Sequence, residues 1–119
     1  MLRLLAILVG IILVFVGVAG FLPQFMTDGL LFGYFQVDSL HNLFHLVSGV
    51  IAILSASSPV MAGWFFKLFG LIYLAIGAAG FYYQGDLTMM QMNQADNILH
   101  IVLGVVFLYF GVFLKKPSA

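Results

Sequence analysis

The sequence predicts an all-α membrane protein: four transmembrane helices in a bundle, built from two parallel helix-pair repeats. Apolar residues make up 64% of the 119 residues and charged residues only 7%, a composition that excludes an ordinary soluble surface. Four apolar runs approach the ~20 residues that cross a hydrocarbon core. The second half of the chain also repeats the pattern of small and polar residues in the first. We therefore expect a single four-helix transmembrane domain over residues 1–119.

The four apolar runs place the helices in order along the chain. We expect them near residues 4–22, 40–57, 63–83 and 96–114. Two sets of residues recur: Gly10, Gly17 and Gly20 as Gly70, Gly77 and Gly80, and Asn42, His45 and Gly49 as Asn97, His100 and Gly104. The repeats therefore cover about residues 1–58 and 59–119. Two crossings per repeat return the chain to its starting side, so the two copies are expected to be parallel.

The basic residues predict the orientation. They all fall beside one membrane face: Arg3, Lys67, Lys115 and Lys116. By the positive-inside rule we expect a multi-pass protein of the bacterial inner (cytoplasmic) membrane with both termini in the cytoplasm.

Small residues at seven-residue spacing predict how the helices pack. The pairs are Gly10 and Gly17, Gly49 and Ala56, Gly70 and Gly77, and Gly104 and Gly111. Helices in lipid associate through close backbone approach, which small residues permit. We expect these glycines to form packing seams and assign them no chemistry.

Polar residues gather at the outer end of the second and fourth helices. Asp38, His41 and His45 are spaced i, i+3 and i+7, which puts them on one helical stripe, and Asp96 and His100 have the matching spacing. These five residues are candidate ligands for zinc or another divalent ion, because imidazole and carboxylate groups bind such ions. A proton-sensing role for the histidines stays open.

Other roles for the same residues also remain open. Asn42 and Asn97 lie one turn before His45 and His100, so each amide could bond the imidazole of the other copy. The same four residues are candidates for holding a b-type haem, with the two histidines as axial ligands. A purely structural role is also consistent with the sequence, since aspartates cap helix N-termini and histidines form interhelical hydrogen bonds.

The sequence lacks the residues that several classes of function require. The chain has no cysteine, which excludes disulfides, thiolate nucleophiles and Cys-ligated clusters. It has no Gly-x-Ser-x-Gly elbow, no phosphate-binding loop and no basic patch for nucleic acid. The apolar segment 29–37 is too short to span and is expected at the outer interface, where it caps the histidine end or meets a partner.

Two motifs resemble a known family. One is Leu-His-Asn-x-x-His, which lies within segment 31–49 and is followed by Gly49. The other is Ala-Asp-Asn-x-x-His, segment 95–100, which is followed by Gly104. Together they resemble the bacterial four-helix membrane protein family catalogued as domain of unknown function 4383. The resemblance implies four spans and marks the family's polar positions: His41, Asn42, His45, Asp96, Asn97 and His100. It implies no activity.

These observations predict a small integral membrane protein without catalysis of its own. We expect an accessory or scaffolding subunit that lies in the lipid bilayer and packs against other membrane proteins or itself. The alternative is a redox membrane protein that binds haem b or a divalent metal through the paired histidine motifs at the outer end.

Overall fold

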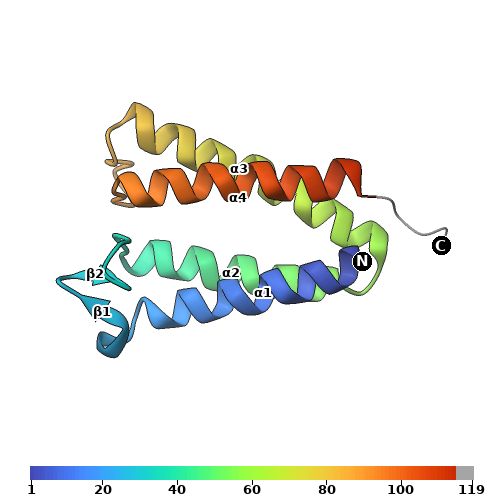
Figure 1. Cartoon of the computed structure of the whole chain (residues 1–119), viewed down its shortest axis with the longest axis horizontal. Coiled ribbons are helices and arrows are strands. Elements are labelled where there is room, and N and C mark those ends of the chain that lie inside the picture. Colours follow the sequence, from blue (N-terminus) through green and yellow to red (C-terminus); the bar gives the residue numbers. More distant parts are fainter. Residues whose placement is uncertain (115–119) are drawn as a thin grey trace.

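The computed structural model describes residues 1–114 and is all-helical apart from one small hairpin (Figure 1). The four helices are α1 (Leu2–Ala19), α2 (Ser39–Ser55), α3 (Pro59–Tyr82) and α4 (Gln94–Phe113). The helical fold predicted from the sequence is confirmed, and each helix lies close to its expected range. Lys115 and Lys116, two of the four residues used to predict orientation, lie outside the described residues.

Three of the helices have the length and apolar composition of membrane spans. These are α1, α3 and α4, with 18, 24 and 20 residues. Helix α2 has 17 residues, because Asp38 caps its start and a serine-rich turn follows its end. At 1.5 Å per residue it is roughly 26 Å long, slightly less than a typical hydrocarbon core.

Side-chain caps fix where the last three helices begin. Asp38 accepts a hydrogen bond from the backbone N–H of His41 at the start of α2, and Ser58 does the same for Met61 in α3. Helix α4 begins with a capping box, in which the side chains of Asn93 and Asp96 accept from each other's backbone N–H. Each such cap contributes about 1 kcal/mol. The caps at α2 and α4 set the positions of the histidines that follow.

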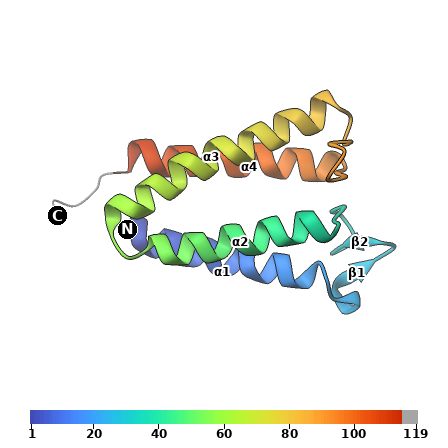
Figure 2. The ribbon, with the colours of Figure 1, turned by 180° about the vertical axis from the view of Figure 1, so that it is seen from behind.

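The helices form two close pairs, α1 with α2 and α3 with α4 (Figures 1 and 2). Glycines line the contact within each pair, as the seven-residue spacing predicted. A β-carbon on Gly10 would lie 2.7 Å from the carbonyl oxygen of Gly49, and one on Gly70 would lie 3.1 Å from that of Gly104. The contacts in the two pairs correspond at the same offsets of 60 and 55 residues that relate the sequences.

Aromatic rings fill the space between the two pairs. Phe44 of α2 meets Tyr73 of α3 with ring centroids 5.3 Å apart, and Tyr73 meets Phe107 of α4 at 5.7 Å. Phe66 continues this layer toward the end where the N-terminus lies, with its ring 5.4 Å from that of Phe107. Close backbone packing therefore holds each pair together, whereas large rings separate the pairs. This wider spacing leaves room for side-chain chemistry between them.

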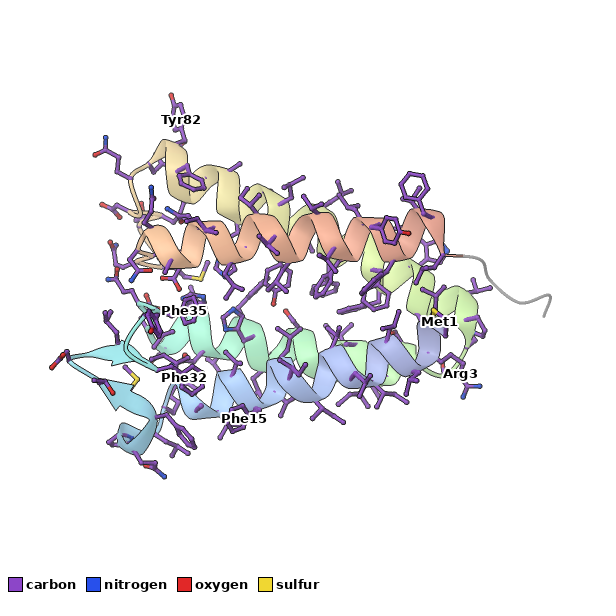
Figure 3. The ribbon with its side chains drawn as sticks, in the orientation of Figure 1. Met1, Arg3, Phe15, Phe32, Phe35 and Tyr82 are labelled. Carbon is purple, nitrogen blue, oxygen red and sulfur yellow. The ribbon has the colours of Figure 1, made fainter. Side chains whose placement is uncertain are left out.

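The connection between α1 and α2 contains a 3-10 turn, η1 (Pro23–Phe25), and a hairpin of β1 (Met26–Thr27) and β2 (Leu30–Leu31). The sequence did not predict this hairpin. Figure 3 shows Phe32 and Phe15 beside each other at the hairpin end, and their rings stack with centroids 6.3 Å apart. Arg3 lies at the opposite end, where its Nε donates to the Ala56 carbonyl oxygen over 2.6 Å.

The connection between α3 and α4 meets the first connection. The backbone N–H of Gln91 donates to Asp38, and the Asn93 amide donates to the Tyr34 carbonyl oxygen, over 3.0 and 2.9 Å. The Gln91 side chain also donates to Asp86, which lowers the pKa of that exposed carboxyl. These bonds join the two helix pairs at the end that holds the histidines.

Candidate metal centre between the helix pairs

Three histidines meet between α2 and α4. The cap at Asp38 makes His41 the third residue of α2, and His45 follows one turn later on the same face. The capping box of α4 places His100 one turn beyond Asp96. All three imidazoles are buried, with 1%, 4% and 1% of the surface of His41, His45 and His100 exposed.

The imidazole nitrogens lie close enough to share one ion. The Nε2 atoms of His41 and His100 are 3.3 Å apart, and a nitrogen of His45 lies within 4.8 Å of both. Two nitrogens bound 2.0–2.1 Å from a tetrahedral zinc ion are themselves roughly 3.3–3.4 Å apart. His41 and His100 are therefore already at the separation of two ligands on one ion. His45 would complete the set with a shift of at most roughly 1.5 Å.

Most of the ring nitrogens have no hydrogen-bond partner among the described residues. The unpartnered atoms are Nδ1 of His41, Nδ1 of His100 and both nitrogens of His45. A buried polar atom that makes no hydrogen bond costs about 1–3 kcal/mol. Hydrogen bonding within the cluster therefore leaves these four ring nitrogens without a partner, and an ion held between the two Nε2 atoms would take up one of them, a nitrogen of His45.

The two predicted carboxylate ligands act mainly as helix caps. Asp38 accepts from the backbone N–H groups of His41 and Gln91, and Asp96 accepts from that of Asn93. Neither carboxylate belongs to the group of ligand atoms around the histidines. Asp96 is nonetheless 99% buried and lines a cavity of about 60 Å³ together with His45. It is therefore placed to balance positive charge nearby without being a ligand.

The predicted crosswise bonds between asparagines and histidines do not form among the described residues. Asn42 lies against Gly20, which directly follows α1, and Asn97 lies in the same way against Gly80 of α3. A β-carbon on either glycine would collide with the asparagine Oδ1, an atom with no hydrogen-bond partner here. Asn42 and Asn97 thus belong to the contacts within each helix pair and not to the histidine cluster.

A haem does not fit this arrangement. The cavity beside His45 has a volume of about 200 Å³, below the 300–1,000 Å³ of typical cofactor sites. His41 occupies the position next to His100, where the macrocycle of a haem held by His45 and His100 would need to enter. The geometry therefore favours a single small ion.

Tyr73 is a site residue that sequence reasoning missed. Its ring is fully buried, stacks on His45 with centroids 6.3 Å apart and lies 5.6 Å from the ring of His100. The residue 60 positions earlier is Leu13, so the recurring residues of the sequence did not point to Tyr73. A tyrosine in the middle of an otherwise apolar helix was the available clue.

The end of the hairpin and the segment after it cover the cluster. Leu31, Phe32, Phe35 and Val37 line the 60 Å³ cavity together with His45. The sequence left two roles open for the apolar segment 29–37, a cap over the histidine end or a surface that meets a partner. Its position in the structure favours the cap. Figure 3 shows Phe35 at this end of the molecule, beside the start of α2. The cover separates the imidazoles from the outer surface.

A family model described as Domain of unknown function (DUF4383) matches residues 3–113 of the chain. No curated protein and no solved structure matches it.

Proposed function

The chain belongs to the family described as Domain of unknown function (DUF4383), and because that description assigns no activity, we propose a function from the site: binding of one transition-metal ion by His41, His45 and His100. The observation that carries this proposal is the 3.3 Å between two buried imidazole nitrogens from different helix pairs. Imidazole suits zinc, copper, iron and nickel, and three protein ligands leave a tetrahedral ion one open position.

A buried carboxyl group close to the cluster supports the binding of an ion. Three neutral imidazoles leave the charge of a divalent ion uncompensated, which is costly in apolar surroundings. The buried carboxyl of Asp96 borders the same small cavity as His45 and supplies an opposite charge in its ionised form. Because the ligands come from α2 and α4, the ion also joins the two helix pairs.

A zinc titration of the purified, metal-stripped protein against a competing chelator tests the proposal. We expect one zinc ion to bind per chain. Binding no stronger than that of a protein-free detergent sample would overturn the proposal.

We further infer that all four helices cross the membrane as two parallel helix-pair repeats. Helix α2 runs back along α1, so if α1 spans the bilayer then α2 returns through it. The matched glycine contacts of the two pairs support the repeat. Arg3 and Lys67, the basic residues of the described chain, support cytoplasmic termini in a bacterial inner membrane.

Single cysteines test this topology cleanly, because the chain has none of its own. Gln24→Cys and Met89→Cys, in the two outer connections, are expected to react with a membrane-impermeant maleimide on intact cells. Ser57→Cys, in the turn between α2 and α3, is expected to react only after permeabilisation. Equal labelling of all three positions in intact cells would contradict four spans.

The proposal of an accessory or scaffolding subunit rests on a different observation. Only 33–39% of the most apolar stretches of α1, α3 and α4 is buried within the chain. The remaining surface is available to lipid and to other helices. Metal binding is compatible with this role, since an ion that fixes the two pairs also fixes the surface they present. Chemical crosslinking in native membranes tests it: a reproducible partner or homo-oligomer is expected, and a protein that remains monomeric contradicts it.

A further inference from the structure

Each helix pair is packed so closely that it moves as one rigid body. A β-carbon on Gly17 would lie 2.7 Å from the Leu46 backbone nitrogen, and one on Gly77 would lie 2.9 Å from that of Ile101. Two helices whose backbones pack this closely cannot separate without losing many contacts at once. A change of shape in this chain is therefore expected between the pairs and not within them.

The contact between the two pairs is tightly packed in the half nearer the N-terminus. Leu2 and Ala6 of α1 belong there to one buried cluster with Phe66 of α3 and Phe107 of α4. Residues 56–58, which link α2 to α3, lie at this same end of the molecule (Figure 2). Both the apolar packing and the chain itself therefore hold the pairs together at this end.

The half of the contact nearer the histidines is packed more loosely. A cavity of about 200 Å³ lies there between α1 and α4, and a second cavity of about 60 Å³ lies beside it. Two hydrogen bonds join the connections at this end, from Gln91 to Asp38 and from Asn93 to Tyr34. Both are exposed, so water can replace them at little net cost. Packing alone thus holds the pairs together less firmly at the histidine end.

The three histidines make closure of this end depend on an ion. His41 and His45 come from one pair and His100 from the other. Four of their ring nitrogens have no hydrogen-bond partner among the described residues, and separation of the pairs would let water reach them. An ion has the opposite effect, because it binds all three ligands only while the two pairs lie together.

We propose that the bound ion closes a hinge between the two helix pairs. The pairs turn about residues 56–58, separating at the histidine end when the ion is lost and closing when it binds. The structure corresponds to the closed form, in which the Nε2 atoms of His41 and His100 are 3.3 Å apart. This inference rests on the metal centre proposed above and gives it a regulatory consequence: metal supply sets the shape of the chain at this end.

Distances between two spin labels test the hinge in the lipid-reconstituted protein, with saturating zinc and after chelation. The labels are attached to introduced cysteines at exposed helical positions, since the chain has no cysteine of its own. Leu43→Cys with Ile98→Cys spans the two pairs at the histidine end. Pulsed electron paramagnetic resonance should show this distance growing by at least about 3 Å, the width of one water molecule, when zinc is removed.

Two further label pairs are matched controls. Leu54→Cys with Tyr109→Cys spans the same two helices at the opposite end, and Val18→Cys with Leu43→Cys lies within the first helix pair. Both distances are expected to be the same with and without zinc. Adding His100→Ala to the pair at the histidine end should keep its distance long even in zinc, and His45→Ala is the alternative if that variant does not fold.

Three results would overturn the hinge. In the first, the chelator titration shows bound zinc, yet the distance at the histidine end is the same with and without it; the metal centre would then stand without the hinge. In the second, all three distances grow together on chelation, which indicates general loosening. In the third, the His100→Ala and His45→Ala variants close in zinc like the wild type. If the titration shows no zinc binding at all, the metal centre fails and the hinge fails with it.

Discussion

Replacing His45 or His100 with alanine is expected to weaken zinc binding by at least about 100-fold. Each substitution removes one of three nitrogen ligands, and even the loss of a residue that only orients a ligand costs 10–100-fold in metal affinity. His41→Ala should have an effect of the same size, since its Nε2 lies 3.3 Å from that of His100. The chelator titration described above measures all three variants.

Asp38→Asn is the matched control for the histidine variants. Asparagine also caps a helix well, so α2 should keep its start, and the variant should retain zinc affinity within a few-fold of the wild type. A loss equal to that of the histidine variants would make Asp38 a ligand and revise the site. Unchanged zinc affinity in all three alanine variants would contradict the metal centre.

Gly49→Ala is expected to destabilise the protein by up to about 2 kcal/mol, although alanine is the better helix former. The propensity gain is at most ~1 kcal/mol. The added β-carbon would lie 2.7 Å from the Gly10 carbonyl oxygen and 2.7 Å from the Val14 backbone nitrogen. Because both are backbone atoms, they move only if α1 and α2 separate, and overpacking of this kind costs about 1–3 kcal/mol.

Gly104→Ala, at the corresponding place in the second pair, should cost a similar amount, since its β-carbon would lie 2.6 Å from the Leu74 backbone nitrogen. Val50→Leu adds bulk next to Gly49 on an exposed position and serves as the control. Circular dichroism during unfolding in sodium dodecyl sulfate measures the free energy of unfolding for each variant. A Gly49→Ala variant as stable as the wild type would show that α1 and α2 do not pack backbone to backbone at Gly49.

The sequence predicted the position of the polar residues along each helix better than the direction in which they point. His41 and His45 share a face because they are four residues apart, and the structure brings them to His100 as that spacing suggested. Asn42 follows His41 directly and is rotated by about 100° around the helix. It therefore faces α1 and Gly20, where the predicted bond to a histidine of the other pair is out of reach.

Other features depend on tertiary contacts that one sequence does not reveal. The hairpin at Met26–Leu31 lies in the first connection, residues 20–38, which is longer than the second connection, residues 83–93, and no alternating pattern marks its two short strands. The aspartates were candidate ligands by spacing, yet the unpaired N–H groups of a helix start compete for the same oxygens. The carboxylates of Asp38 and Asp96 accept hydrogen bonds from these N–H groups instead of facing the histidines.

The most direct test of the central claim is the metal content of the protein purified from its own membrane without chelators. Elemental analysis should find about one zinc or copper ion per chain in the wild type and almost none in the His45→Ala/His100→Ala double variant. A folded wild-type protein that carries no more metal than this variant would contradict the metal centre, leaving the three histidines as contacts between the helix pairs.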